Sequence, residues 1–251
     1  MILLVDVGNS RIKWAYWQHG ALGDVQHAVH RGRALNEVLD TNWRAMAAPS
    51  AVYVANVAGA GQRHHVIEWA QRHWPHAPYF VTSQAHGGGV TNAYTAPERL
   101  GVDRWLALIA VFQRASLPAV IVNCGTAMTV DALMVDGQHV GGVILPGVHA
   151  MLNGLAADTA LDKPVDVAPK RLLLAQNTHD AMVSGAWMGL VGAVEYIFDE
   201  YAKQWQCEPQ LIVGGGDAAH LASLLNRPVQ VLPHLVLEGL ACLVPTLSSS
   251  G

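Results

Sequence analysis

After its first methionine the chain reads Ile2-Leu3-Leu4-Val5-Asp6-Val7-Gly8-Asn9-Ser10-Arg11-Ile12-Lys13-Trp14. An apolar run of strand length ends near Asp6, and β-branched and aromatic residues resume at Ile12, which predicts two strands joined by a tight turn. A carboxylate at the end of a buried strand, followed by small residues whose backbone N–H groups turn toward one point, suits a Mg²⁺-bound phosphate. Ordinary hairpins use the same residue types, so this stretch alone leaves both interpretations open.

A second stretch of the same design begins near the middle of the chain. It reads Val120-Ile121-Val122-Asn123-Cys124-Gly125-Thr126-Ala127-Met128-Thr129-Val130-Asp131. Gly20 follows Asp6 at the same offset as Gly137 follows Asn123. Two hairpins of one design predict duplicated halves that face each other across a cleft, and we place the two domains at residues 1–115 and 116–251.

Length and composition indicate a globular protein with packed cores. The chain has 251 residues, 51% of them hydrophobic, and a mean hydropathy of +0.23. Its net charge is −4 and no basic run occurs, which disfavours binding to DNA or RNA. We also expect no signal peptide and no membrane span, because the chain opens directly into a strand and no uninterrupted apolar run reaches spanning length.

The three cysteines, Cys124, Cys207 and Cys242, are widely spaced and form no Cys-x-x-Cys pair. This pattern favours neither a disulfide framework nor a structural zinc site, and it indicates a reducing cytoplasm. Cys124 lies in the second turn, where a small residue that fills the turn is a simpler interpretation than a nucleophile, because no base partner is identifiable. The histidines match no ligand spacing such as His-Glu-x-x-His, which disfavours catalytic zinc.

Hydrophobic periodicity predicts an α/β protein with the same order of elements in both halves. In the first half, strands are expected at 22–29, 51–57 and 79–81 besides the opening hairpin, with helices around 35–46 and 66–75. In the second half, strands are expected at 119–122, 128–135, 140–145, 211–213 and 229–232. A short helix is predicted at 148–157, an exposed connector at 158–170, a long helix from a cap at Thr178 or Asp180 to Lys203, and closing helices after 217 and from Leu235.

Glycine clusters mark three further loops. The three glycines at 87–89 cannot fill a core, so we expect the loop at 84–90 either to flex or to let a ligand approach. Gly59-Ala60-Gly61 resembles half of a dinucleotide fingerprint, but the remaining glycine position holds His64, which disfavours a Rossmann site. Gly214-Gly215-Gly216-Asp217 leaves room for a flat ring to lie on backbone, and Asp217 equally suits a helix N-cap.

Asp103 and Arg104 fall in the first turn of an expected helix whose apolar face includes Leu106 and Ile109. An acid in a first helical turn complements the helix dipole, and an adjacent arginine commonly forms an ion pair, so this dipeptide by itself needs no functional explanation. A glycine-rich loop and a turn at Gly101 nevertheless deliver the pair to the same edge of the fold as the first turn. That setting makes Asp103 a candidate catalytic group.

These motifs, taken together and in this order, resemble those of type III pantothenate kinases, a family that includes the branch called Bvg accessory factor. The matching segments cover nearly the whole chain: Asp6-x-Gly8-Asn9-Ser10, Gly101-x-Asp103-Arg104, Gly125-Thr126-Ala127-x-Thr129-x-Asp131, Gly141-Gly142-x-Ile144-x-Pro146-Gly147 and Gly215-Gly216-Asp217. The resemblance implies the actin-like ATPase, or acetate and sugar kinase, fold, with two RNase-H-like halves around an ATP cleft. It also implies ATP-dependent phosphorylation of pantothenate, the first step of coenzyme A biosynthesis.

Carried over by motif, the resemblance also implies roles for individual residues. Asp103 would be the catalytic base, and Asp6 would hold Mg²⁺, directly or through water. The ATP phosphates would be bound by Asp6, Val7, Gly8, Asn9, Ser10, Arg11, Ile12 and Lys13 and by Gly125 and Thr126. Pantothenate would be bound by Tyr94, Gly101, Val102, Asp103, Arg104 and Thr178.

The resemblance further implies a homodimer in which Thr178 reaches pantothenate across the interface. The small residues Ala181, Ser184, Gly185, Gly189 and Gly192 fall roughly on one helix face, which permits close packing against a second copy or within one chain. The family usually has an Asp at the position of Asn123, where that carboxylate is associated with a monovalent cation. An amide supplies an oxygen but no charge, which weakens the case for potassium or ammonium here.

Phosphoryl transfer demands positioning and charge neutralisation more than covalent chemistry. Asp103 would accept the proton of the pantothenate hydroxyl as it attacks, and Arg104 would position the anionic substrate. The alternative is a nucleotide-dependent switch or regulatory protein on the same fold, which would not need Tyr94, Asp103 and Arg104 to converge. A transcription factor is opposed by the acidic charge and the missing DNA-binding motif.

Overall fold

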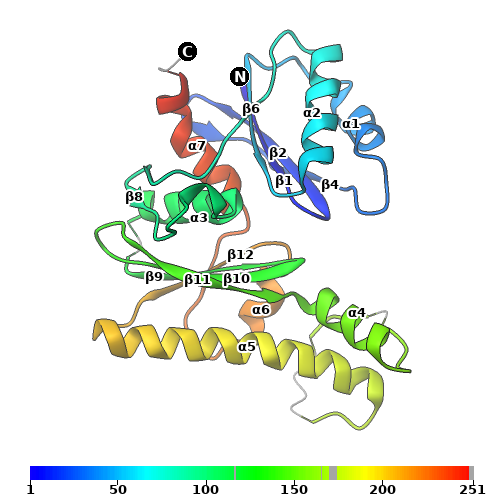
Figure 1. Cartoon of the computed structure of the whole chain (residues 1–251), viewed down its shortest axis with the longest axis vertical. Helices are drawn as coiled ribbons and strands as arrows, with labels where there is room; N and C mark the ends of the chain where they lie inside the picture. The colour runs from blue at the N-terminus through cyan, green and yellow to red at the C-terminus, as the bar shows by residue number, and fades with distance from the viewer. Residues whose placement is uncertain (116, 165, 170–173, 249–251) are drawn as a thin grey trace. The chain divides into compact units, whose positions relative to one another are not determined.

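The computed structural model describes residues 1–115, 117–164, 166–169 and 174–248. The chain divides into two compact units (Figure 1). The first comprises Met1–Arg114 together with the C-terminal segment His234–Gly251, and the second comprises Ala115–Pro233. Each unit contains its own central sheet and its own hydrophobic core.

The first unit is built on a sheet in the order β3-β2-β1-β5-β6, with β4 also paired to β2. Its strands are β1 (Ile2–Val7), β2 (Arg11–Gln18), β3 (Ala21–Leu22), β4 (Gln26–Val29), β5 (Ala51–Asn56) and β6 (Tyr79–Phe80). β1 is antiparallel to β2 and parallel to β5. The opening stretch therefore forms the expected strand, turn and strand. The expected strand at 22–29 is instead two short strands.

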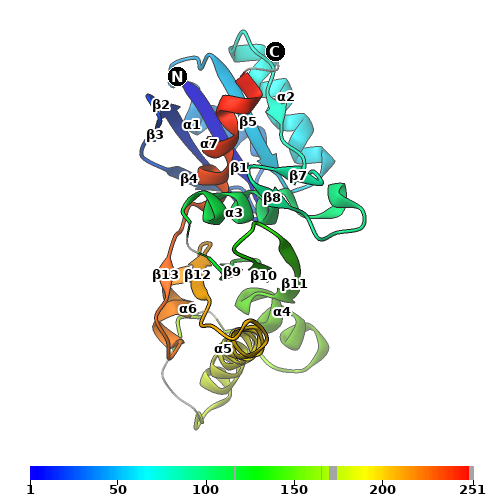
Figure 2. The same ribbon diagram turned by 90° about the vertical axis from the view of Figure 1, so that its left-hand side faces the viewer.

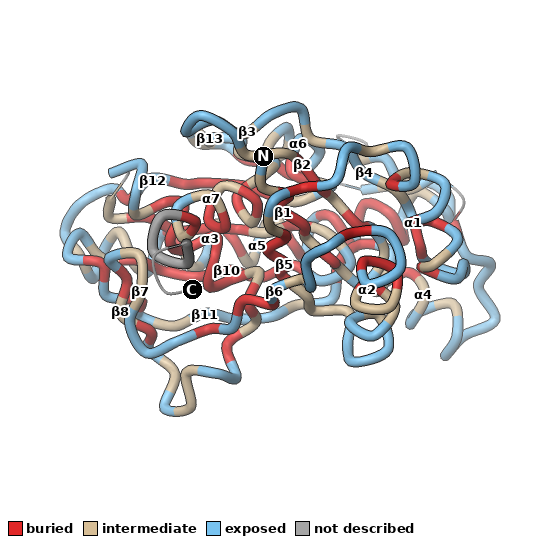
Figure 3. Tube along the Cα trace, turned by 90° about the horizontal axis from the view of Figure 1, so that it is seen from above, coloured by how far each residue is buried: buried red, intermediate tan, exposed pale blue. Residues whose placement is uncertain are grey.

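Helices cover both faces of this sheet (Figures 1 and 2). On one face, α1 (Leu35–Trp43) and α2 (Ala60–His73) bury Trp43 and Trp69 against the sheet. On the other face lie α3 (Val102–Gln113) and α7 (Leu235–Ser248). Because successive strand side chains alternate between faces, β1 contributes to both cores. The buried stretches accordingly follow β1, β5 and α3 (Figure 3).

The second unit repeats the design. Its sheet has the order β11-β10-β9-β12-β13, with β9 antiparallel to β10 and parallel to β12. Its strands are β9 (Ala119–Cys124), β10 (Ala127–Leu133), β11 (His139–Pro146), β12 (Gln210–Gly214) and β13 (Gln230–Val231). Gly20 and Gly137 both adopt positive φ just after the second strand of their sheets. The shared strand order confirms the predicted duplication.

Three helices pack on one face of the second sheet: α4 (Val148–Asp158), α5 (Thr178–Trp205) and α6 (Ala218–Leu224). α5 is the one helix in the described ranges that is long and apolar enough to cross a membrane by length and composition. Its residues Met182, Trp187, Leu190 and Phe198 are nevertheless buried in the core of the unit. α5 therefore has the amphipathic pattern of a core helix.

The C-terminal helix lies in a different unit from the one expected from the sequence. α7 belongs with the first unit, although residues 116–251 were expected to form the second domain; Ser116 and residues 249–251 lie outside the described residues. Its residues Leu237, Leu240 and Val244 share a core with Leu4 and Leu106. Gly239 allows this packing, since a Cβ there would lie 2.1 Å from the backbone oxygen of Leu106.

Two local expectations also change. The loop at 84–90 contains a small hairpin, β7 (His86–Gly87) and β8 (Val90–Thr91), packed on α3. Gly88 and Gly89 have positive φ. A Cβ at Gly88 would clash with Ile109 and one at Gly89 with Phe112, so local packing explains these glycines without a ligand.

The N-cap of α5 is Asn177, whose side chain accepts a hydrogen bond from the Asp180 N–H. The expected connector at 158–170 falls partly outside the described residues.

Candidate active site

The first turn, residues 8–10, is fixed by the pairing of β1 with β2. Leu3, Val5 and Val7 point into the α1/α2 core and Leu4 into the α3/α7 core, so strand alternation places Asp6 on the α3/α7 side. Lys13 lies directly opposite Asp6 in the ladder. Side chains at directly opposed positions share a face, which brings a carboxylate and an ammonium together beside the turn.

The turn itself is closed by a hydrogen bond from the Gly8 N–H to the Arg11 oxygen at 3.0 Å. Asn9 and Arg11 are exposed, whereas Val7 and Ile12 are fully buried. Of the eight residues expected to form the first phosphate loop, Val7 and Ile12 can therefore contribute only through their backbone.

Asp103 lies in the first turn of α3, on the same side of the sheet as Asp6. The neighbouring Val102 and Leu106 pack into the α3/α7 core, which holds this end of the helix against the sheet. Burial raises the pKa of Asp6 to about 7; Lys13 opposes this increase and the negative charge of Asp103 adds to it. Two carboxylates and one ammonium therefore interact electrostatically in the first unit.

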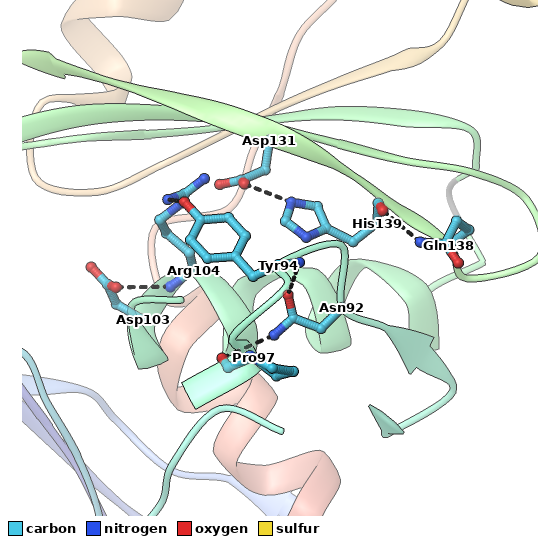
Figure 4. Close-up of polar contacts among 8 residues, drawn as sticks. All are labelled: Asn92, Tyr94, Pro97, Asp103, Arg104, Asp131, Gln138 and His139. Atoms are coloured by element: carbon cyan, nitrogen blue, oxygen red, sulfur yellow. Dashed lines mark hydrogen bonds and ion pairs between the residues drawn. The ribbon is translucent and has the colours of Figure 1, made fainter. Parts of the chain in front are cut away.

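Arg104 is almost fully buried and faces Tyr94 (Figure 4). Its Nη1 donates a hydrogen bond to the Tyr94 hydroxyl at 2.8 Å, and its guanidinium lies 5.6 Å from the centre of that ring. The Arg104 backbone N–H donates to Asp103 Oδ1 at 2.9 Å. Gly101 leaves space for that carboxylate, since a Cβ there would lie 2.6 Å from Asp103 Oδ1. Tyr94, Asp103 and Arg104 are thus joined by hydrogen bonds; their roles toward pantothenate stay a prediction.

Asn92 organises the loop that carries Tyr94, a role that the sequence analysis did not predict. Its Oδ1 accepts the Tyr94 N–H, and its Nδ2 donates to the backbone oxygen of Pro97 (Figure 4). The Nδ2 also donates to the backbone oxygen of Gln84. Asn92 is buried. An Asn between a glycine-rich loop and a proline is the only signal that could have suggested a loop-organising side chain.

The second turn, residues 125–126, is enclosed by backbone from two other segments of the second unit. The Gly147 N–H donates to the Thr126 oxygen at 3.1 Å, and the Asp217 N–H donates to the Cys124 oxygen at 3.1 Å. A Cβ at Gly147 would lie 2.0 Å from the Gly125 oxygen, and one at Gly215 would lie 2.2 Å from the Cys124 oxygen. Both glycines are therefore required by close backbone approach.

The strand registers make the two turns equivalent. Asp6 pairs with Lys13 across the first hairpin, and Asn123 pairs with Thr129 across the second. The position of Asp6 is thus occupied by Asn123, which is half-buried, in the second unit. Thr129 is buried, and its Oγ1 has no hydrogen-bond partner within the described ranges.

Three other sequence interpretations can be assessed in the second unit. Cys124 is buried, and burial together with Asp217 raises its pKa to about 12, so a thiolate nucleophile is disfavoured. Asp217 occupies the N-cap position of α6 but makes no side-chain capping hydrogen bond. Thr178 is exposed at the start of α5.

A buried polar pair was not anticipated from the sequence. His139 Nε2 lies 2.9 Å from Asp131 Oδ1, joining β11 to β10 (Figure 4). Both side chains are almost fully buried. The sequence identified Asp131 only as part of a motif, because a histidine eight residues away across a hairpin is invisible without the strand register.

Comparison with known proteins matches this chain to one family. The family model of type III pantothenate kinase matches residues 2–200. A type III pantothenate kinase of Nitrosococcus oceani is 42% identical over 247 residues, covering 96% of this chain and 92% of that protein. One of Leptothrix cholodnii is 34% identical over 99% of this chain and 98% of its own length. The chain belongs to the type III pantothenate kinase family.

Membership confirms the predicted family and enzyme class. Type III pantothenate kinases phosphorylate pantothenate in coenzyme A biosynthesis, and they are enzymes that use ATP. The alternative of a nucleotide-dependent switch protein is not favoured. The narrower placement in the Bvg accessory factor branch stays a prediction.

Solved structures confirm the fold. A conserved putative Baf family transcriptional activator from Campylobacter jejuni aligns with a TM-score of 0.63 at 18% identity, covering 98% of this chain and 99% of that one. The activator of 2-hydroxyisocaproyl-CoA dehydratase from Clostridium difficile, with bound ADPNP, aligns with a TM-score of 0.54 at 12% identity over 99% of this chain and 96% of that one. These similarities support the predicted actin-like ATPase and sugar kinase fold.

In the protein without ligands, Asp6→Asn is expected to increase the free energy of unfolding above pH 7 and to change it little below pH 4. Between the ordinary pKa of 3.8 and the folded-state pKa of about 7, the folded parent holds a proton that the unfolded chain releases. Stability of the parent therefore falls as pH rises through this window, and Asn removes that loss. The difference between the two pKa values bounds the gain at ~4 kcal/mol.

Urea unfolding of both proteins from pH 4 to pH 8.5 measures this effect. Asp24→Asn, at an exposed carboxylate of the same unit, is the matched control and should give no such pH-dependent gain. If the free energies of unfolding of Asp6→Asn and the parent differ by the same amount from pH 4 to pH 8.5, the pKa of Asp6 is not raised by burial.

Proposed function

We propose that Asp103 is the base in a reaction that transfers the γ-phosphoryl group of ATP to the primary hydroxyl of pantothenate. One observation carries this proposal: Asp6, Lys13 and Asp103 lie close enough in the first unit for their charges to shift the pKa of Asp6. A helix-dipole role would explain an acid at this position but not its electrostatic coupling to the carboxylate beside the first turn. Phosphoryl transfer uses such a cluster of charges for positioning and neutralisation.

The residues beside the first turn fit a bound Mg²⁺. Burial and the negative charge of Asp103 disfavour ionised Asp6, and a divalent cation would offset both effects. Carboxylate oxygens are the ligands that Mg²⁺ prefers, so Asp6 would hold the ion directly or through water. When bound, Mg²⁺ supplies charge neutralisation at the phosphate oxygens.

The remaining roles follow from side-chain chemistry. Lys13 and the backbone N–H groups of Asn9, Ser10 and Thr126 would bind phosphate oxygens. Gly8 and Gly125, whose N–H groups donate to the Arg11 and Ala127 oxygens, would shape the two turns. Asp103 would accept the hydroxyl proton of pantothenate as that oxygen attacks the γ-phosphorus. Arg104, fixed by its hydrogen bond to Tyr94, would bind the carboxylate of pantothenate.

Asp103→Asn should lower kcat by roughly 100-fold or more, because the substitution removes the proton acceptor but preserves size. ATP binding should survive. The matched control is Glu37→Gln, which removes an exposed acid from the first turn of another helix in the same unit and should leave kcat unchanged. Turnover and melting temperature are measured on each protein.

A helix-dipole role for Asp103 would give a different result. It predicts a stability loss of about 0.3–1 kcal/mol with nearly unchanged turnover, as expected for the control. If Asp103→Asn still binds both substrates and turns over within about threefold of the parent, Asp103 is not the base.

We further propose a homodimer in which one face of α5 packs against a second copy. Ala181, Gly185, Gly189 and Gly192 are exposed, and a Cβ at any of these three glycines would meet no atom within 4 Å. Ser184, grouped with them from the sequence, is buried and does not belong to this exposed set. Exposed Met188 and Tyr196 make the same face partly apolar. Thr178 at the start of α5 would then reach pantothenate bound to the partner.

Sedimentation at assay concentration should show a dimer, and Gly189→Glu should shift it to a monomer with at least tenfold lower activity. Gly154→Glu, in the exposed part of α4, is the control and should stay dimeric and active. A parent that sediments as a monomer with full activity would contradict the shared site.

Asn123 leads us to propose a weak dependence on monovalent cations. Its amide can contribute an oxygen to potassium or ammonium but no negative charge. Activity in buffer with sodium as the only monovalent cation should stay within about threefold of that with potassium. Asn123→Asp should increase the ratio of activity in potassium to activity in sodium. If the parent loses all activity without potassium or ammonium, a carboxylate at this position is not needed for cation dependence, and the proposal is wrong.

We place this activity in the cytoplasm, acting on pantothenate and ATP without nucleic acid or membrane. The acidic net charge supports the absence of a nucleic-acid partner. Burial of one face of α5 within its own unit supports a role for that helix outside the membrane.

A further inference from the structure

His30 contacts the first turn in two ways, although it lies twenty residues further along the chain. Its Nε2 lies 2.7 Å from the Gly8 oxygen, and its backbone N–H donates to the Ser10 oxygen at 3.1 Å. The next residue, Arg31, also donates to the Ser10 oxygen, at 3.3 Å. Only 3% of His30 is exposed. A carbonyl oxygen can only accept, so Nε2 carries the proton in this contact.

The contact with Gly8 fixes the direction of a peptide plane. A trans peptide is planar, with its C=O and the following N–H pointing in opposite directions. Holding the Gly8 oxygen toward His30 therefore directs the Asn9 N–H away from His30. Gly8 has wide backbone freedom, so without this contact the plane could rotate at little cost.

The second unit has a structurally equivalent backbone contact. β4 ends at Val29, opposite Arg11, and β11 ends at Pro146, opposite Ala127. The next residues, His30 and Gly147, therefore occupy equivalent positions, and each donates its backbone N–H to a carbonyl of its turn.

The two turns differ in length, and the two contacts differ accordingly. Gly125 and Thr126 separate the second pair of strands, whereas Gly8, Asn9 and Ser10 separate the first. At the shorter turn there is no room for a side chain at Gly147, since a Cβ there would lie 2.0 Å from the Gly125 oxygen. At the longer turn, the imidazole of His30 spans the distance to the Gly8 carbonyl.

We propose that His30 is a positioning residue that orients the Asn9 N–H toward the phosphates of bound ATP. The inference rests on the proposed function only in assigning phosphate binding to the first turn. Both the neutral Nε2–H tautomer and the imidazolium can donate this hydrogen bond, so the role does not require a change of protonation.

The test compares variants of the full chain that differ in the donor at this position. His30→Phe keeps a ring but removes the donor, and it should raise the Kd for Mg-ATP by about 5- to 10-fold. Adenosine, which has no phosphates, should bind the variant and the parent equally. The KM for pantothenate should change less than twofold. His64→Phe, on the exposed side of α2, is the matched control and should alter none of these values.

A second pair of variants covers the case in which His30→Phe does not fold. The amide of His30→Gln can reach the Gly8 oxygen and should restore Mg-ATP binding to within about threefold of the parent. His30→Asn is one methylene shorter and should not restore it. This ordering would support a positioned donor, since both substitutions introduce the same amide and differ only by one methylene in its reach.

Two results would overturn the proposal. One is equal Mg-ATP affinity in all folded variants, with only the melting temperature reduced. The other is an equal loss of affinity for ATP and adenosine, which would indicate a general disturbance of the site. If the parent binds Mg-ATP but does not phosphorylate pantothenate, the proposed function fails while the binding comparison still decides the role of His30.

Discussion

A carboxylate that is difficult to ionise lies at the centre of this protein's candidate site. Asp6 ends the buried strand β1, and strand alternation directs it to the side of the sheet where α3 begins. Burial and Asp103 raise its pKa to about 7, against the effect of Lys13. Such an arrangement costs stability in the protein without ligands, and a cation beside the carboxylate would recover it. The folded protein is therefore less stable without ligands, but its charged groups are already in place to bind a cation.

The second unit uses the same fold with different chemistry. Asn123 occupies the position of Asp6, so the second turn has no carboxylate at its strand end. Gly147 and Gly215 instead bring two other segments into backbone contact with the turn. Duplication therefore supplied two turns of one design, of which the first carries charge and the second presents mainly backbone.

Much of the fold could be predicted because its signals are local. The hairpins at Asp6 and Asn123, the long helix α5 and the motif at 101–104 follow from periodicity and turn residues. The position of α7 could not be predicted, because only tertiary packing of Gly239 against α3 assigns it to the first unit. His30, Asn92 and the Asp131–His139 pair were missed for the same reason, since each acts across a register or loop that the sequence does not reveal.

The most direct test of the account is whether ADP release by the purified protein depends on pantothenate. With Mg-ATP and pantothenate together, we expect ADP and phosphorylated pantothenate in equal amounts, and little ADP when pantothenate is omitted. ADP release that is unchanged by pantothenate, or that yields no phosphorylated pantothenate, would contradict the account.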